Sequence, residues 1–316
     1  MEIAILGGGS WGIALAMHLA KKGYSIKVWE FFEEDAKKMQ ENRFCRLLPE
    51  VKLPQNVIVS SKMEEVLSSC ELILLVVPSD KVKSTMEKAK AFLEKQPIVI
   101  CSKGLGENLE LMTDLVGEIV SNELFCFYGP THAEEVCKGM FSGAVLAGEK
   151  KERLKELKKI LETKEFKVEI SEDLVGVQIG AALKNIMAVF IGVLEGMNWG
   201  DNAKAYVMTK GLDEIKRVGL RMGAKPEIFY GLAGMGDLIV TCMSRHSRNR
   251  YLGEQVGKGR KLIEVIEEME MVAEGVTTVK RAVGLKEKLG LDLPLITGLH
   301  TILFEGGKPE EALKNI

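Results

Sequence analysis

The 316-residue sequence is poor in proline and in net charge, and each shortage excludes a class of protein. Eight prolines accompany 32 glycines, a composition that argues against disorder and indicates tight turns and close backbone contacts. The 43 Lys and Arg residues nearly cancel the 45 Asp and Glu residues, which leaves a net charge of −2. Broad electrostatic binding to nucleic acid or to an anionic membrane is therefore excluded, although a local basic pocket is not.

Paired cysteines and long hydrophobic runs are also missing. The six cysteines include no Cys-x-x-Cys pair, and no two Cys or His residues have zinc-ligand spacing, so we expect reduced core thiols and no metal site. Uninterrupted apolar runs such as 72–77 are far shorter than the roughly 18 residues that span a bilayer. A strand-like apolar run starts within two residues of Met1, so we expect no signal peptide. The sequence predicts a cytoplasmic protein without an integral membrane segment.

The hydrophobic pattern predicts two domains that meet near residue 170. Before that point, short apolar runs alternate with longer helical patterns such as 11–22 and 81–95. The apolar runs are 3–6, 25–29, 57–59, 72–77, 98–101, 124–127 and 144–147. This alternation predicts an α/β domain over residues 1–170, with a Rossmann-like, doubly wound and mostly parallel sheet.

Beyond that point the sequence shows helical patterns and no alternating strand pattern. These helical patterns are 174–196, 206–222, 262–269, 276–289 and 297–304. They predict an all-helical C-terminal domain over residues 171–316.

A glycine-rich loop joins the first apolar run to the first helical pattern. Its residues Gly7-Gly8-Gly9-Ser10-Trp11-Gly12 fit the pattern GxGxxG. Gly7 would make the tight turn, Gly9 would let a pyrophosphate approach the backbone, and Gly12 would allow close helix–strand packing. The free N–H groups at the helix start would then hold the phosphates. In this strand–helix context the motif predicts a dinucleotide site, although alone it also fits a plain turn.

An acidic residue follows at the distance that such a site requires, about 20 positions on. Glu30 ends the second apolar run, 18 residues after Gly12. A carboxylate there accepts hydrogen bonds from ribose hydroxyls and repels a 2′-phosphate, and the following Phe31 and Phe32 offer no cation. We therefore expect NADH to be preferred over NADPH. A solvated glutamate at a strand end is the other interpretation of Glu30.

Two further loops follow predicted strands, and so lie at the carboxyl edge of the sheet, where ligands bind in open α/β folds. They are Ser102-Lys103-Gly104 and Gly129-Pro130-Thr131. Thr131 and Glu134 have the spacing of a capping box, which predicts a helix that begins at this edge. Either loop alone is typical of structure, but together with the glycine loop they indicate one ligand-binding edge.

The predicted second domain contains a lysine inside an apolar helix. Lys184-Asn185 lies within the pattern 174–196, which is apolar nearly all round. A lysine there either reaches solvent from a rim or occupies a partly dry site, where desolvation would lower its pKa and make it a usable proton donor. Downstream, Asp237 stands in the glycine-bracketed Gly234-Met235-Gly236-Asp237-Leu238, shortly before Thr241. The neighbouring amide and this carboxylate favour the functional interpretation of Lys184.

Three arginines and several other hydrogen-bond donors follow within the seven residues Ser244-Arg245-His246-Ser247-Arg248-Asn249-Arg250. In a chain of near-zero net charge, this cluster suits one small anion better than a nucleic-acid backbone. A solvated basic face is the alternative.

Taken in order, these segments resemble one family, the NAD(P)-dependent glycerol-3-phosphate dehydrogenases in their soluble bacterial form. The matching segments are the glycine loop with Ser10-Trp11, Ser102-Lys103-Gly104, Gly129-Pro130-Thr131, Lys184-Asn185, Gly236-Asp237-Leu238 and Ser247-Arg248-Asn249. Val272-Ala273-Glu274-Gly275 is similar to a later Val-Glu-Gly segment of the family. The resemblance covers essentially the whole chain. It implies an NAD- or NADP-dependent oxidoreductase that reversibly reduces dihydroxyacetone phosphate to sn-glycerol 3-phosphate, the backbone of phospholipids.

The resemblance also implies roles for individual residues. Lys184 would be the catalytic acid/base and Asp237 its charged partner. The residues implied to bind the phosphorylated substrate are Lys103, Gly129, Thr131, Lys184, Asn185, Asp237, Thr241, Ser247, Arg248 and Asn249. The glycine-loop motif, the spacing of Glu30 and the resemblance together give the residues expected to bind the dinucleotide: Gly7, Gly9, Ser10, Trp11, Gly12, Glu30, Phe31, Lys103, Ala133, Arg248, Val272 and Glu274.

One departure from the family pattern concerns the cofactor. Glu30-Phe31 stand where many bacterial members have a small residue followed by a basic one, which again favours NADH.

Other assignments remain open from the sequence. A β-hydroxyacid or ketopantoate-type reductase has the same architecture and also uses a lysine on a second-domain helix, but Ser247-Arg248-Asn249 favours a phosphorylated substrate. A non-enzymatic NADH-sensing module would need the glycine loop and Glu30 but no Lys184–Asp237 pair. Apolar helical second domains often pair, which makes a homodimer an expectation from the fold.

Overall fold

The computed structural model describes residues 1–269 and 273–314, which form two compact units. The first unit consists of Met1–Ser102 and Met112–Leu174, and the second of Lys103–Leu111 and Val175–Ile316. The segment Lys103–Leu111 lies within the range predicted for the first domain, but its contacts place it in the second unit. Lys103 therefore belongs to the unit that carries the predicted catalytic residues.

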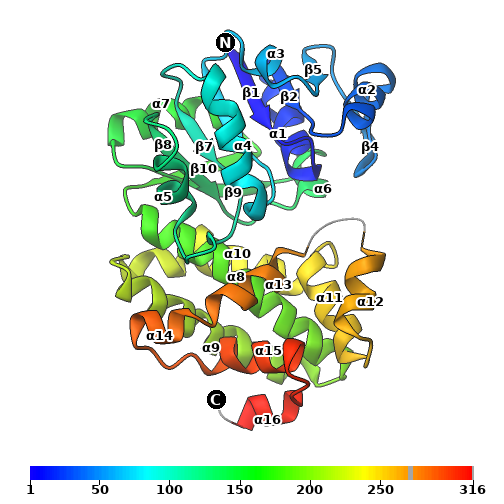
Figure 1. Cartoon of the computed structure of the whole chain (residues 1–316), viewed down its shortest axis with the longest axis vertical. Coiled ribbons are helices and arrows are strands. Elements are labelled where there is room, and N and C mark those ends of the chain that lie inside the picture. The colour runs from blue at the N-terminus through cyan, green and yellow to red at the C-terminus, as the bar shows by residue number, and fades with distance from the viewer. Residues whose placement is uncertain (270–272, 315–316) are drawn as a thin grey trace. The chain divides into compact units, whose positions relative to one another are not determined.

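An eight-stranded sheet forms the centre of the first unit (Figure 1). Its strand order is β10-β9-β8-β7-β6-β1-β2-β5, and each neighbouring pair is parallel except the antiparallel β8 and β9. The strands are β1 (Glu2–Leu6), β2 (Ser25–Trp29), β5 (Val57–Ser60), β6 (Leu72–Leu75), β7 (Ile98–Ile100), β8 (Leu124–Tyr128), β9 (Ser142–Ala147) and β10 (Phe166–Ser171). The predicted doubly wound, mostly parallel sheet is confirmed.

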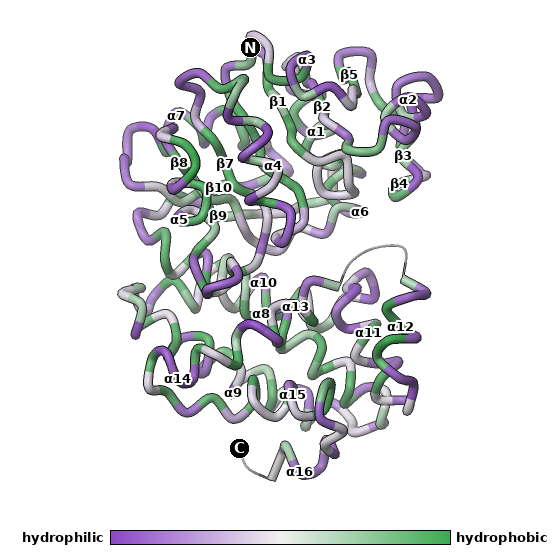
Figure 2. The backbone as a smooth tube through the Cα atoms, in the orientation of Figure 1, coloured by the Kyte–Doolittle hydropathy of each residue, from purple (hydrophilic) through white to green (hydrophobic). Residues whose placement is uncertain are grey.

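Helices cover both faces of this sheet, because successive side chains of a strand point to opposite sides. Ile3 and Ile5 of β1 pack with one set of helices, whereas Ala4 and Leu6 pack with the other. The first set is α1 (Ser10–Lys21), α2 (Glu33–Asn42), α6 (Ala133–Val136) and α7 (Lys151–Leu161). The second set is α3 (Met63–Leu67), α4 (Val82–Ala89) and α5 (Met112–Gly117), with the short turns η1 (Ser79–Lys81) and η2 (Lys90–Phe92) on either side of α4. The strands β1 and β7 are hydrophobic, whereas α2 is largely hydrophilic (Figure 2).

The first unit also contains strands that the apolar runs do not predict. β10 alternates buried Phe166 and Val168 with exposed Lys167 and Glu169, as expected of an edge strand with one covered face. β3 (Phe44–Cys45) and β4 (Leu48–Lys52) form a separate antiparallel pair. A search for continuous apolar runs overlooks strands of this one-sided kind.

The second unit is helical, as predicted for its described residues. Its elements are α8 (Leu174–Gly196), α9 (Gly200–Arg221), η3 (Pro226–Tyr230), η4 (Leu232–Gly236), α10 (Asp237–Met243), α11 (Arg248–Gly257), α12 (Leu262–Glu268), α13 (Glu274–Ala282), α14 (Leu285–Leu289), α15 (Pro294–Phe304) and α16 (Pro309–Lys314). The helical pattern 276–289 corresponds to two helices, α13 and α14, since a turn at Val283 and Gly284 interrupts it.

α8 is the core helix of this unit, with every residue from 176 to 194 buried. Within the described chain it is the one helix long and apolar enough to cross a membrane. However, 89% of its most apolar window is buried inside the protein, which is the burial of a core helix.

Glycines allow the backbones of α8 and α11 to touch. A Cβ atom added to Gly192 or Gly196 of α8 would overlap a carbonyl oxygen of α11. Likewise, a Cβ added to Gly253 or Gly257 of α11 would overlap a carbonyl oxygen of α8. Because no side chain separates the two helices here, this packing fixes the position of α11 relative to the helix that carries Lys184.

Candidate active site

The glycine loop has the conformation that its sequence predicts. Gly7 follows β1 with φ +127°, a left-handed conformation that L side chains rarely adopt. A Cβ on Gly12 would overlap the carbonyl oxygen of Gly7, so α1 packs against the loop only because Gly12 has no side chain. Gly9 instead faces open space, with no heavy atom of the described chain within 4 Å of an added Cβ. The loop is thus tight at both ends and open at its centre.

The start of α1 offers unsatisfied donors next to this open position. Gly9 is the N-cap of α1 and provides no side-chain hydrogen bond, and the first turn contains no acidic residue. The indole N–H of Trp11 is buried and has no hydrogen-bond partner among the described residues. A buried donor without a partner costs about 1–3 kcal/mol, so this one fits a site that a polar ligand completes.

Glu30 follows β2, and its side chain lies against the glycine loop. A Cβ added to Gly8 would overlap Oε2 of Glu30, and Oε1 accepts a hydrogen bond from the Phe32 N–H at 3.1 Å. Burial raises the pKa of the Glu30 carboxyl above its usual range, against the opposing effect of the Phe32 N–H. The acidic residue therefore stands beside the GxGxxG loop, as the spacing predicts.

Phe31, the residue after Glu30, has a side chain that is largely exposed to solvent. Its ring is 58% exposed and stands edge-on to Trp29, with ring centroids 6.0 Å apart. The ammonium of Lys88, from α4, lies 5.1 Å from the centroid of the Phe31 ring. Sequence reasoning missed this cation, because Lys88 comes from a different element and no local signal connects it to Glu30.

The loop after β8 departs from the predicted capping box. Helix α6 has His132 as its N-cap, with no side-chain cap bond, and the Thr131 hydroxyl donates to the Gly129 carbonyl at 3.1 Å. The capping-box prediction for Thr131 and Glu134 is wrong, because the helix begins one residue later and Thr131 closes its own turn. Gly129 is needed for close packing, since a Cβ there would lie 2.6 Å from the Cα of Ala144. Ala133 is the first residue of α6 and is buried.

In the second unit, four predicted residues form one polar cluster. The ammonium of Lys184, on α8, donates to Oδ1 of Asp237 and, at 2.7 Å, to the hydroxyl of Thr241. Asp237 is the first residue of α10, and Thr241 lies one turn later, where its hydroxyl donates to the Asp237 carbonyl at 2.6 Å. Lys103 donates to Oδ2 of Asp237 at 2.8 Å. One carboxylate thus pairs with two ammonium groups.

Burial controls the charge state of this cluster. Lys184 and Asp237 are 4% and 1% exposed. Desolvation lowers the pKa of the Lys184 ammonium to about 7; Asp237 opposes this shift, and the positive charge of Lys103 adds to it. The Lys184 ammonium therefore loses its proton more readily than that of an ordinary lysine.

A second polar group connects α8, α11 and α13. The amide of Asn249 donates to Oδ1 of Asn185 at 3.1 Å, and the Gly275 N–H donates to Oδ1 of Asn249 at 2.8 Å. A Cβ on Gly275 would lie 2.7 Å from the Asn185 carbonyl oxygen, so only glycine fits here. Glu274 begins α13, whereas Val272 lies outside the described residues, so its predicted role stays a prediction.

The basic cluster forms the start of α11. Ser247 is its N-cap and accepts a hydrogen bond from the Arg250 N–H, Arg248 is the exposed first residue of the helix, and Asn249 is buried. The helix end therefore carries a hydroxyl and a guanidinium beside its first N–H groups, an arrangement suited to an anion. The described residues contain no group of three or more His, Cys, Asp or Glu side chains that could hold a metal ion.

Comparison with known proteins gives consistent matches over the whole chain. The models for the N-terminus and C-terminus of NAD-dependent glycerol-3-phosphate dehydrogenase match residues 2–154 and 173–314. A glycerol-3-phosphate dehydrogenase (NAD(P)+) of Fusobacterium nucleatum is 37% identical, over 100% of this chain and 96% of its own. The corresponding protein of Chlorobium phaeobacteroides is 38% identical, over 100% of this chain and 97% of its own.

Solved structures agree with these sequence matches. The glycerol-3-phosphate dehydrogenase of Coxiella burnetii superposes with a TM-score of 0.96 and 32% identity, over 99% of this chain and 98% of that chain. A ketopantoate reductase from Ralstonia eutropha gives a TM-score of 0.64 at 16% identity, over 99% of this chain and 100% of that chain, and shares the fold alone. Since both family models and full-length relatives above 30% identity cover it, the chain belongs to the NAD-dependent glycerol-3-phosphate dehydrogenase family of oxidoreductases.

Proposed function

We propose that this enzyme reversibly reduces dihydroxyacetone phosphate to sn-glycerol 3-phosphate, with Lys184 as the acid/base and NADH as the preferred cofactor. The observation that carries the proposal is the buried contact of Lys184 with Asp237 and Thr241. Family relatives are named glycerol-3-phosphate dehydrogenase (NAD(P)+), which supports the substrate and the use of NAD or NADP.

Lys184 has the proton that the reaction needs. When a carbonyl is reduced, its oxygen gains negative charge and requires a proton. The Lys184 ammonium, with a pKa lowered to about 7, can donate that proton at neutral pH and take one back in the reverse direction. General acid catalysis of this kind typically contributes about 10²–10⁴-fold to the rate. Asp237 and Thr241 hold the ammonium in one orientation, which prevents it from swinging away as its charge changes.

The charges in the second unit favour an anionic substrate. Lys103 and Lys184 share one carboxylate, so the cluster with both ammonium groups protonated has an excess of one positive charge. Arg248, Ser247 and Asn249 at the start of α11 would bind the phosphate, because a guanidinium and the N–H groups at a helix start both bind phosphate oxygens well. Binding of the phosphate, which takes no part in the bond changes, would position the carbonyl for proton transfer.

The glycine loop of the first unit would bind the cofactor, which supplies the hydride when bound. Gly9 leaves space for a pyrophosphate, and the unpartnered indole N–H of Trp11 fits a polar ligand beside it. Gly7, Ser10, Gly12, Phe31 and Ala133 complete the set proposed for this unit. Glu30 would bind ribose hydroxyls and repel a 2′-phosphate, which supports the preference for NADH.

One assay tests this proposal: oxidation of NADH and of NADPH with dihydroxyacetone phosphate as acceptor. We expect a higher kcat/KM with NADH, and a much lower rate when unphosphorylated dihydroxyacetone replaces the substrate. The variant Glu30→Ser should shift the ratio towards NADPH. A higher kcat/KM with NADPH in the unaltered enzyme would refute the role of Glu30, and no reduction of dihydroxyacetone phosphate would refute the activity.

The cellular setting is a further part of the proposal. We propose that the product supplies the backbone for phospholipid synthesis, that the enzyme acts in the cytoplasm, and that it forms a homodimer. Sedimentation of the purified enzyme tests the last point, since a monomer at micromolar concentration would contradict it. Depletion of the enzyme in its host should reduce phospholipid synthesis, and added sn-glycerol 3-phosphate should restore it.

A further inference from the structure

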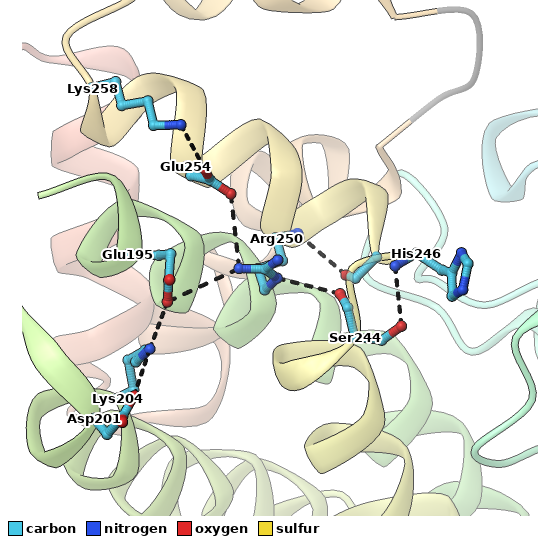
Figure 3. A network of polar contacts seen from close by, with 9 residues as sticks. Glu195, Asp201, Lys204, Ser244, His246, Arg250, Glu254 and Lys258 are labelled. Carbon is cyan, nitrogen blue, oxygen red and sulfur yellow. Dashed lines mark hydrogen bonds and ion pairs between the residues drawn. The ribbon is translucent and has the colours of Figure 1, made fainter. Parts of the chain in front are cut away.

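Two arginines at the start of α11 have different environments. Arg248 is exposed, whereas the side chain of Arg250, two residues later, is 18% exposed and points into the second unit (Figure 3). The proposed function uses Arg248, Ser247 and Asn249 for the substrate phosphate and gives Arg250 no role.

Arg250 closes the turn that comes before this phosphate-binding segment. Its Nε donates to the carbonyl of Ser244 at 3.3 Å, and its backbone N–H donates to Oγ of Ser247 at 3.2 Å. Within the turn, the Ser247 N–H donates to the Ser244 carbonyl at 3.2 Å, and the His246 N–H donates to the Ser244 hydroxyl at 3.1 Å. The carbonyl of Ser244 is therefore held from two sides, by the backbone of Ser247 and by the guanidinium of Arg250.

Two carboxylates face the other side of the guanidinium at ion-pair distance. Nη1 of Arg250 lies 4.0 Å from Oε2 of Glu195, in the last turn of α8, and 3.8 Å from Oε2 of Glu254, one turn further along α11. Lys204 of α9 holds Glu195 at 2.6 Å, and Lys258 holds Glu254 at 2.6 Å. Arg250 thus connects the Ser244 turn to the end of α8. In this region glycines allow the backbones of α8 and α11 to pack in direct contact.

We propose that Arg250 is a positioning residue for phosphate recognition: it holds the Ser244–Ser247 turn so that Ser247 and Arg248 present their donors in a fixed arrangement. This inference rests on the proposed function of Ser247 and Arg248. An arginine suits the role because its planar guanidinium can donate to the Ser244 carbonyl with one edge and face carboxylates with another. A lysine carries the same charge as a single point and cannot hold both sides at these positions.

The test compares Arg250→Lys with Lys258→Ala, a matched control. Lys258 pairs with Glu254, which in turn faces Arg250. Lys258 therefore belongs to the same network of charges but contacts Glu254 rather than the Ser244 turn. We expect Arg250→Lys to raise KM for dihydroxyacetone phosphate about tenfold, the effect of losing a charged hydrogen bond. The value of kcat, KM for NADH and the rate with unphosphorylated dihydroxyacetone should change less than about twofold. Lys258→Ala should leave all of these values unchanged.

A role in stability alone predicts a different pattern. It would lower the thermal midpoint, and kcat would fall equally with the phosphorylated and unphosphorylated acceptors because less enzyme is folded. That pattern, or an unchanged KM for dihydroxyacetone phosphate, would overturn the proposal. If Arg250→Lys does not fold, Glu195→Gln decides instead: it removes one carboxylate facing Nη1 and should raise the same KM severalfold, and an unchanged KM would overturn the proposal.

A binding measurement that needs no turnover separates this inference from the proposed function. Inorganic phosphate should raise the thermal midpoint of the unaltered enzyme, and Arg250→Lys and Arg248→Ala should both reduce that increase. If the unaltered enzyme neither reduces dihydroxyacetone phosphate nor responds to phosphate, the proposed function fails and this inference fails with it. If it does both, and only Arg250→Lys retains the full response, the role of Arg250 alone is refuted.

Discussion

Two buried ionisable side chains of the second unit, Lys184 and Glu214, share a property but differ in their partners. They are 4% and 1% exposed, and burial moves the pKa of each to about 7. Lys184 contacts the side chains of Asp237 and Thr241, and Asp237 in turn binds a second ammonium group. Glu214 accepts hydrogen bonds from the backbone N–H groups of Leu295 and Ile296, at 2.6 and 3.2 Å.

Glu214, on α9, caps a different helix. α15 begins after Leu293, which has no side-chain acceptor, and Pro294 has no N–H. The next two N–H groups belong to Leu295 and Ile296, the positions that an N-cap side chain normally satisfies. Glu214 therefore caps the start of α15 from another helix, in place of a Ser or Asp side chain at the N-cap position.

The difference shows that a shifted pKa does not identify a catalytic group. We infer that the partners distinguish the two groups: Lys184 contacts the ionisable side chain of Asp237, as its proposed acid/base role requires, whereas Glu214 contacts two backbone N–H groups. We therefore expect Lys184 to control the rate and Glu214 to control the stability of the same unit.

The largest effect is expected for Lys184→Ala. Loss of the proton donor should lower kcat for reduction of dihydroxyacetone phosphate by about 10²–10⁴-fold. The fold should survive, because Lys103 still binds Asp237 and prevents a buried, unpaired carboxylate. Steady-state kinetics and a thermal unfolding curve on the same preparation check both points.

Lys216→Ala is the matched control for this variant. Lys216 lies on α9 in the same unit, and its exposed ammonium contacts the hydroxyl and the ring of Tyr230, which has no role in the proposed reaction. Its loss should leave kcat unchanged. If Lys184→Ala retained more than about a tenth of the wild-type kcat, the acid role would move elsewhere, for example to His132 or His246.

A smaller effect is expected for Asp237→Asn, seen in the pH profile. In the proposed reaction Lys184 must be protonated for reduction, so kcat/KM should fall as pH rises through about 7, the value to which burial lowers the pKa of this ammonium. The carboxylate of Asp237 raises that pKa, so its neutral replacement should move the fall to lower pH. At pH 7.5 we expect a loss of about tenfold or more, since a neighbouring opposite charge shifts a pKa by about 1–3 units. A pH profile with an unchanged midpoint would refute the claim that Asp237 raises the pKa of Lys184.

The sequence predicts one of these two buried groups and not the other, for a physical reason. Lys184 interrupts a helix that is otherwise apolar, so its sequence position alone marks it as unusual. Glu214 stands in α9 among other charged residues, and its partner is a helix start about 80 residues later, which has no acceptor of its own to mark it. Likewise, nothing in the segment around Lys103 indicates that its partner is Asp237, 134 residues further along the chain.

The elements of the fold show the same contrast between features that the local sequence marks and features that it does not. Strands buried on both faces, such as β6 and β7, are continuous apolar runs and are predicted directly. The edge strand β10 is missed because only alternate residues are buried. The break between α13 and α14 and the start of α6 at Ala133 depend on local turns that a helical pattern does not specify.

Glu214→Ala tests the contribution of Glu214 to the stability of the second unit. It leaves two buried N–H groups of α15 without an acceptor, which should cost about 2 kcal/mol and lower the thermal midpoint by about 5 °C. The kcat of the folded enzyme should stay within about twofold of wild type, because no group proposed for the reaction contacts Glu214. Asp213→Ala, an exposed carboxylate one residue earlier on α9, is the control for charge loss. A large loss of kcat without a loss of stability would contradict the purely structural role expected for Glu214.

The smallest expected effect concerns the pH dependence of stability. The pKa of Glu214 is raised in the folded protein to about 7, mainly by burial, so the folded state binds a proton that the unfolded state releases between about pH 4.5 and 7. Its contribution to stability is therefore full at low pH and lost as pH rises through 7, about 1 kcal/mol between pH 6 and pH 8. Glu214→Gln cannot titrate, so the stability of wild type minus that of the variant should fall by this amount over the same range. Comparing the two proteins cancels groups that titrate in both, such as His18, whose pKa burial lowers. If the difference instead stayed constant between pH 6 and pH 8, the carboxyl would already be ionised in the folded state over this range, and Glu214 would be a carboxylate held by its two backbone N–H bonds rather than a buried acid.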